Sequence, residues 1–186
     1  MFCFKKKKTS FSSTTKDGRS ITIELPLIPR KTSKVGLELI KHFEDFRSDA
    51  YMCPAGVWTI GYGHTKGVKK GQKISKSKGE VFLKSDILWA ENAVKKMVSV
   101  KLNQMQFDAL VSLVFNIGVG AFKSSTLLSI INKGEYIPVA SEFERWVYSD
   151  GRVLKGLVRR RRAERNVWNG VVPEEIIDVL KKEEIG

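Results

Sequence analysis

The feature that most constrains this chain is a single change in its hydrophobic period. Between residues 34 and 170 every strong pattern has the 3.6-residue period of a helix, except in the short stretch 51–65. That stretch combines β-forming residues with glycines that permit tight turns, namely Val57, Trp58, Thr59, Ile60, Gly56, Gly61 and Gly63. The sequence therefore predicts a mainly helical protein with one small β region near its N-terminal side.

The expected helices follow from apolar residues spaced three and four positions apart. They cover approximately residues 37–46, 75–98, 103–117, 124–133, 139–147 and 157–169. Asn103, followed three residues later by Gln106, predicts a capping box at the start of the third helix. In the second helix we expect the core to include Val81, Phe82, Trp89, Val94 and Met97.

Composition divides the chain into three regions. Residues 1–33 carry eight basic and two acidic side chains and a Ser/Thr-rich run, so we expect a partly disordered basic extension with a short strand within 21–28. Residues 34–170 contain the helical patterns. Residues 171–186 form an acidic tail in which Pro173, followed by two acidic residues, is typical of a helix start.

The formal net charge of +13 favours binding to a polyanion, either nucleic acid, anionic lipid or the acidic polymers of a bacterial envelope. No apolar run approaches the roughly 20 residues that span a bilayer, and no secretory signal is recognisable. Cys3 and Cys53 do not form a disulfide framework and are compatible with a reducing cytosol. We expect a monomer without a metal or cofactor.

Glu44 is the first candidate for a catalytic residue. It follows Leu37 and Ile40 on the apolar face of the first expected helix and stands directly before the β stretch. A carboxyl group in that position either pairs with a cation or keeps its proton. General-acid catalysis requires an acid that keeps its proton, and glycoside hydrolysis commonly uses one. Periodicity alone also allows an exposed or salt-bridged glutamate.

The segment from Phe43 to Thr65 resembles the catalytic segment of the phage-type lysozymes, the endolysin muramidases. In that family a Glu is followed after eight residues by Asp or Cys, and after five more by Thr. The residues at those positions are Glu44, Cys53 and Thr59. The run GVWTIGYGHT, which ends at Thr65, accompanies them.

Further segments extend the resemblance through most of the chain. They are ISKSKGEVFLKSDI at 74–87, QFDALVSLVFNIGVGAFKSSTLL at 106–128 and GLVRRRRAERNVW at 156–168. Gly79 departs from the pattern, because a better helix former is usual there. The resemblance implies an α+β, lysozyme-like fold that is mainly helical, with a small N-terminal β-lobe, a larger C-terminal helical lobe and a cleft between them.

The resemblance also implies an activity, hydrolysis of the β-1,4 bond between N-acetylmuramic acid and N-acetylglucosamine in peptidoglycan. Glu44 would protonate the glycosidic oxygen, while Cys53 and Thr59 would position a water on the opposite sugar face, giving inversion. Cys53 departs from the aspartate version of the site, because a neutral thiol cannot supply the charge of a carboxylate. The positions that match sugar contacts of the family are Thr65, Phe115 and Ser125.

Three further positions have counterparts in the family. Arg159 matches an arginine that lies against the catalytic glutamate, whereas we expect residues 160–162 to form a solvated helix face. His64 and Asp86 match a structural pair, in which each ion would favour the charged state of the other.

The sequence also allows other functions. Cys53 as nucleophile with His64 as base would make a peptidoglycan peptidase. The basic charge allows a nucleic-acid-binding protein, although no binding motif is recognisable. A lysozyme fold without activity is a third alternative. For a muramidase we expect adsorption to the acidic envelope, location in the host bacterium's cytoplasm before lysis, and dependence on a separate holin-like membrane permeabiliser.

Overall fold

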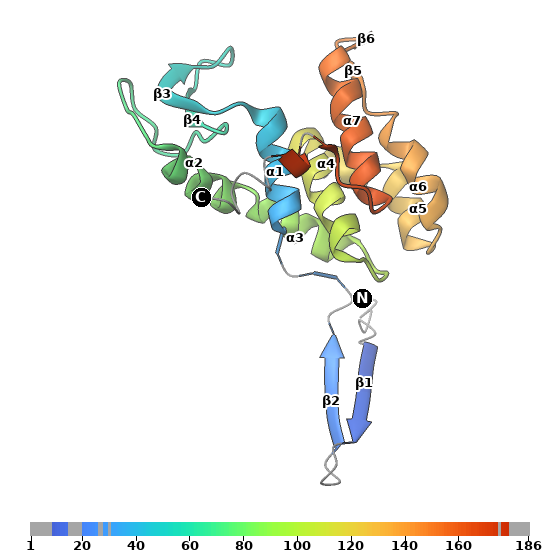
Figure 1. Cartoon of the computed structure of the whole chain (residues 1–186). Helices are drawn as coiled ribbons and strands as arrows, with labels where there is room; N and C mark the ends of the chain where they lie inside the picture. Colours follow the sequence, from blue (N-terminus) through green and yellow to red (C-terminus); the bar gives the residue numbers. More distant parts are fainter. Residues whose placement is uncertain (1–8, 15–19, 26–27, 30, 175, 179–186) are drawn as a thin grey trace, which may run out of the picture.

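The computed structural model describes residues 9–14, 20–25, 28–29, 31–174 and 176–178 of the chain (Figure 1). A small lobe built on two strands joins a larger lobe of helices. The fold is therefore α+β with helices predominating, as the sequence predicts.

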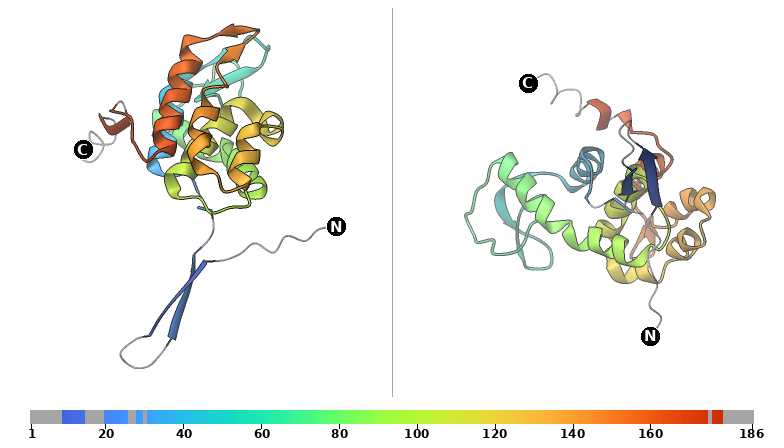
Figure 2. Two further views of the ribbon diagram at one scale, coloured as in Figure 1. Left: turned by 90° about the vertical axis from the view of Figure 1, so that its right-hand side faces the viewer. Right: turned by 90° about the horizontal axis from the view of Figure 1, so that it is seen from below.

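An antiparallel hairpin precedes this body and extends away from it (Figure 2). Its strands are β1 (Thr9–Thr14) and β2 (Ser20–Leu25). The sequence predicts a strand in the region of β2 but not its partner, because the Ser/Thr-rich run of β1 offers little apolar surface to bury. Residues 1–8, on which the prediction of disorder mainly falls, lie outside the described residues.

The first helix of the body leads directly into the small lobe. α1 (Lys34–Glu44) is capped at its N-terminus by Ser33, whose hydroxyl accepts a hydrogen bond from the Gly36 amide at 3.5 Å. After Glu44 the chain turns at Asp45 and enters β3 (Arg47–Met52), which pairs antiparallel with β4 (Trp58–Gly61). Glu44 therefore stands at the junction of the two lobes.

Two helices connect the small lobe to the rest of the body. They are α2 (Lys76–Asp86) and α3 (Leu88–Met97), and helical hydrogen bonds continue through Ile87 between them. Val94 is fully buried, as expected, but Val81 and Trp89 are 58% and 42% exposed. Their assignment to the core is wrong, because this connecting helix pair is covered on one side only, the side of Leu83 and Val94.

α4 (Gln104–Lys123) is the central helix and packs against α1, α3 and α7. The predicted capping box is present: the Gln106 amide donates to Asn103 Oδ1 with an N···O distance of 2.8 Å, and the Asn103 amide donates to Gln106 Oε1 at 3.0 Å. At Gly118 the backbone leaves the helical conformation, with φ 82°, and then resumes it. Among the described residues α4 is the one helix long and apolar enough to cross a membrane, and its central position in the core accounts for that composition.

The remaining elements complete the helical lobe. They are α5 (Thr126–Asn132), α6 (Tyr136–Phe143), the short hairpin of β5 (Tyr148–Ser149) and β6 (Arg152–Val153), and α7 (Lys155–Trp168). The β5–β6 hairpin was not expected, although the Asp150-Gly151 pair at its turn is a typical hairpin signal and both residues have positive φ. The tail begins a helical turn after Pro173, as predicted, and buries Ile176 against the body.

Candidate active site

Glu44 is the last residue of α1, and its side chain is 24% exposed. Its carboxylate accepts a hydrogen bond of 2.6 Å from Nη1 of Arg160, an arginine of α7 whose side chain is only 5% exposed. The Arg160 guanidinium also lies over the ring of Phe43, 5.6 Å from its centroid. A partly solvent-accessible carboxyl group is thus held by a buried cation.

The arginine in contact with Glu44 is not the one that the resemblance implies. Arg159 is exposed and Arg160 makes the contact, so the assignment was one residue out of register. The expected solvated face is also wrong for Arg160 and Arg161, which are 4% and 0% exposed, and holds for Arg162. Each helical step turns a side chain by about 100°, so adjacent arginines face different surroundings.

A signal for this register is present in the sequence. The buried residues of α7 are Arg160, Arg161, Glu164, Val167 and Trp168. Their spacing is that of one helix face, so counting back from the apolar pair Val167 and Trp168 places two arginines and a glutamate on the buried side. Hydrophobicity alone missed them, because charged residues are seldom buried unless they are paired.

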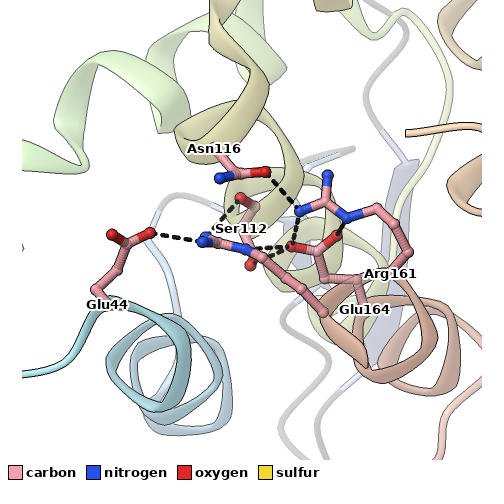
Figure 3. A network of polar contacts seen from close by, with 6 residues as sticks. Glu44, Ser112, Asn116, Arg161 and Glu164 are labelled. Carbon is pink, nitrogen blue, oxygen red and sulfur yellow. Dashed lines mark hydrogen bonds and ion pairs between the residues drawn. The ribbon is translucent and has the colours of Figure 1, made fainter. Parts of the chain in front are cut away.

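A buried polar network joins α4 and α7 (Figure 3). Glu164 is fully buried, and its Oε1 accepts from Ser112 Oγ at 2.7 Å and from Arg160 Nε at 3.2 Å. Arg161 lies 2.9 Å from the other oxygen of Glu164 and donates to Asn116 Oδ1 at 2.8 Å. Burial lowers the pKa of Arg161, and the negative charge of Glu164 opposes that effect.

The small lobe supplies Cys53 and Thr59. Thr59 is buried in β4, and its hydroxyl donates to the Val57 carbonyl at 3.1 Å. Cys53 follows β3, in a turn closed by its own amide donating to Val57 O at 3.0 Å. Hydrogen bonds from the Val57 backbone, and further from the Ala55 backbone and the Thr59 hydroxyl, lower the pKa of the Cys53 thiol.

His64 and Asp86 are in contact, as the resemblance implies. Nδ1 of His64 lies 2.8 Å from one carboxylate oxygen of Asp86, and Nε2 lies 2.9 Å from the Lys66 carbonyl. The imidazole is also stacked on Phe82, with ring centroids 4.2 Å apart. Both ring nitrogens and one ring face are therefore occupied by protein groups, and the histidine joins the turn after β4 to α2.

The positions expected to contact sugar are spread over both lobes. Thr65 is exposed after β4, and Phe115 is half-buried on α4, where it stacks on the exposed Trp89 with ring centroids 5.7 Å apart. Ser125 caps α5, accepting from the Leu128 amide at 3.0 Å and donating to Phe122 O at 2.7 Å. It borders a pocket of about 270 Å³ together with Trp146.

A larger cavity of about 1460 Å³ lies between the end of α1, the first half of α7 and the tail. Arg160 lines it, but Glu44, Cys53 and Thr59 do not. In the described part of the chain no three His, Cys, Asp or Glu side chains are grouped so that they could hold a metal ion.

Comparison with known proteins decides the family. A family model described as "Phage lysozyme" matches residues 41–164, a range that contains Glu44, Cys53, Thr59 and the α7 network. The chain belongs to the phage lysozyme family. Its function is that of a muramidase, a glycoside hydrolase that acts on peptidoglycan in cell wall lysis.

Individual phage lysozyme relatives agree with this assignment. The endolysin of Acyrthosiphon pisum secondary endosymbiont phage 1 is 44% identical over 140 residues, covering 73% of this chain and 96% of the relative. The endolysin of Salmonella phage P22 is 41% identical over 141 residues, with 73% and 96% of the two chains covered.

A solved structure gives the same result. The muramidase domain of SpmX from Asticaccaulis excentricus superposes with a TM-score of 0.71 at 39% identity, covering 75% of this phage lysozyme and 98% of that chain. Nothing in these similarities supports the peptidase or the nucleic-acid-binding alternative. As an endolysin, the protein acts on the host cell wall after release.

Proposed function

We propose that Glu44 is the general acid of this muramidase and protonates the glycosidic oxygen of the leaving sugar. The observation that carries this role is its contact with Arg160 at the junction of the two lobes. The buried guanidinium fixes one carboxylate oxygen, while the partial exposure of Glu44 leaves the group accessible to a substrate. General acids must be held within hydrogen-bonding reach of the atom that they protonate.

On the other side of the sugar, we propose that Thr59 and Cys53 position the attacking water, so that hydrolysis inverts the anomeric carbon. Their hydrogen-bonded turn brings a hydroxyl and a thiol together. The lowered pKa of Cys53 raises the fraction of thiolate, which would accept the proton that the water loses. This partly offsets the absence of a carboxylate at position 53.

The remaining site residues take supporting roles in this proposal. Phe115, stacked on Trp89, would offer an apolar surface to a sugar ring, and Thr65 would contribute a hydroxyl. The capping bonds of Ser125 engage its hydroxyl both as donor and as acceptor, so its contact with sugar would use the second lone pair. His64 and Asp86 would act on stability rather than on chemistry.

Substitution of Glu44 by glutamine tests the mechanism, because glutamine keeps the shape but cannot donate a carboxyl proton. With purified peptidoglycan, the wild-type chain should release fragments with new reducing N-acetylmuramic acid ends, detected by mass spectrometry. Glu44→Gln should lower that activity by about a thousandfold, which lies within the contribution attributed to general-acid catalysis. New free amino groups in place of reducing ends would indicate a peptidase and contradict the proposal.

We also infer that residues 34–170 form the catalytic unit, with residues 1–33 as a basic extension and residues 171–186 as an acidic tail. The family match at 41–164 lies inside this unit. Removal of residues 1–30, which keeps Ser33 as the cap of α1 and Thr32 in contact with Glu91, should then leave turnover of soluble glycan fragments unchanged. A lost turnover with an unchanged melting temperature would place part of the site in the extension.

For delivery, we propose that the protein waits in the cytoplasm of the host bacterium and reaches the wall through a separate membrane permeabiliser of the holin type. Its net charge of +13 would then hold it on the acidic envelope. Cells that express only this chain should retain it. Its appearance in their culture medium without lysis would contradict this route.

A further inference from the structure

Glu164 contacts the arginine that holds Glu44 and is therefore its indirect neighbour in the site. Glu164 is fully buried, one helical turn after Arg160 in α7. A buried carboxylate is costly unless charged or polar groups surround it. Ser112, Arg160 and Arg161 all contact this one, at 2.7 Å to 3.2 Å.

Arg160 is held between two carboxylates. Its Nη1 donates to Glu44 at 2.6 Å, its Nε donates to Glu164 at 3.2 Å, and its Nη2 donates to the Ser112 carbonyl at 3.4 Å. These acceptors come from α1, α7 and α4 respectively. Every nitrogen of the guanidinium therefore has an acceptor in place, and the direction of the Nη1 bond toward Glu44 is fixed by the other two contacts.

The charges of this group balance. Two guanidinium groups, Arg160 and Arg161, face two carboxylates, Glu44 and Glu164 (Figure 3). We propose that Glu164 is a positioning residue. Its negative charge partly neutralises Arg160, so that Glu44 can still be protonated near neutral pH. This inference rests on the proposed role of Glu44 as general acid.

The direction of the effect follows from the charges. Without the negative charge of Glu164, two arginines would face Glu44 alone and favour its ionised form more strongly. Titratable or charged side chains also line the cavity that Arg160 lines. They are His42 and Asp45 at the end of α1, Lys155, Arg159 and Arg162 of α7, and Glu174 and Asp178 of the tail. From α4, Ser112 and Asn116 contact the arginines without charge, and in the small lobe Cys53 carries a titratable thiol.

The test compares pH profiles of kcat/KM on soluble glycan fragments for the wild-type chain, Glu164→Gln and Glu164→Asp. Glutamine keeps the shape of the side chain without its charge, whereas aspartate keeps the charge with a shorter reach. The matched control is Glu91→Gln, because Glu91 is also buried and paired, with Lys95 at 3.2 Å, but does not contact the network around Arg160.

We expect Glu164→Gln to move the alkaline limb of the profile by about half to one pH unit toward lower pH, the effect of a unit charge across one guanidinium. Relative activity on the alkaline side would fall about three- to tenfold with little change in KM. In Glu164→Asp the alkaline limb should lie at the wild-type pH, because the charge is kept. In Glu91→Gln it should also stay at the wild-type pH. Both results are expected even if these variants melt at a lower temperature. The position of the limb does not depend on how much enzyme is folded, so a poorly soluble variant can still be measured.

Two results would overturn the inference. An unmoved limb in Glu164→Gln, with a loss of stability like that of Glu91→Gln, would make Glu164 a structural residue only. A shift toward higher pH would show that Arg160 leaves Glu44 when Glu164 is neutralised. Failure of the proposed role of Glu44 looks different, because Glu44→Gln would then still form new reducing ends.

Discussion

The contact between His64 and Asp86 is where stability and activity can be separated most directly. The imidazole makes a 2.8 Å contact with the carboxylate, a 2.9 Å contact with the Lys66 carbonyl and a stacked contact with Phe82. Its side chain is 11% exposed, and that of Asp86 is 27% exposed. Substitution of His64 by alanine removes all three contacts and touches neither Glu44 nor Thr59.

The magnitude can be worked from these contacts. A hydrogen bond to a charged group contributes about 1.5–3 kcal/mol, one to a neutral carbonyl about 1 kcal/mol, and a stacked ring pair about 0.5–1.5 kcal/mol. Asp86 is exposed enough for water to replace part of the lost contact, which lowers the sum. We therefore expect His64→Ala to lower the free energy of unfolding by about 3 kcal/mol, or the melting temperature by about 6–12 °C in a chain of this length.

Thermal unfolding followed by circular dichroism measures this loss, and turnover of peptidoglycan well below both melting temperatures measures activity. His42→Ala is the matched control, since His42 is exposed and its removal should change the free energy of unfolding by no more than about 0.5 kcal/mol. An unchanged melting temperature together with lost turnover in His64→Ala would refute the structural reasoning and make His64 a catalytic candidate.

Three further predictions concern other parts of the molecule. A methyl group at Gly79 would lie 2.7 Å from the Phe46 ring. Gly79→Ala should therefore lower the free energy of unfolding by about 1 kcal/mol net, despite the better helix propensity of alanine, and this loss would be measured as a lower urea midpoint. Burial raises the pKa of Asp108 above its unfolded value of about 3.9. The folded state therefore binds the proton more tightly, and the contribution of Asp108 to stability should fall as the pH rises from about 3.9 to the higher pKa of the folded state. Urea titrations at low and neutral pH should show Asp108→Asn losing less stability than wild type over this rise. Lysis of whole envelopes should weaken between about 0.01 M and 0.15 M ionic strength, where the Debye length falls from about 30 Å to 8 Å, while turnover of small soluble glycans should not.

Much of the fold could be predicted because its signals are local. The capping box at Asn103 and the 3.6-residue period of α4 depend only on neighbouring residues, and both are present. Val81 and Trp89 were misplaced because period alone does not tell which side of a helix has a partner. Gly79, which looked like a weak helix residue, is explained only by a distant contact, the Phe46 ring.

The candidate site shows the same division between local and distant information. The spacing of Glu44, Cys53 and Thr59 is visible in the sequence, and the structure places them at the end of α1 and in the β3–β4 hairpin that follows. The partner of Glu44 was missed by one residue, because four consecutive arginines give no side-chain contrast from which to read a register. The register becomes visible only when the apolar residues at the end of α7 are included.

This register explains why α7 can bury two arginines at all. On an apolar face each would remain an uncompensated buried charge, which costs several kcal/mol. Glu164 lies four residues after Arg160 and three after Arg161, the two spacings that bring helix side chains together. One carboxylate thus pairs with both arginines from within the same helix, and Glu44 meets the nitrogen of Arg160 that Glu164 and Ser112 leave unused. Because Arg160 contacts both carboxylates, a change of charge at residue 164 should alter the electrostatic environment of Glu44. The charge of residue 164, rather than its size, is therefore the property to vary.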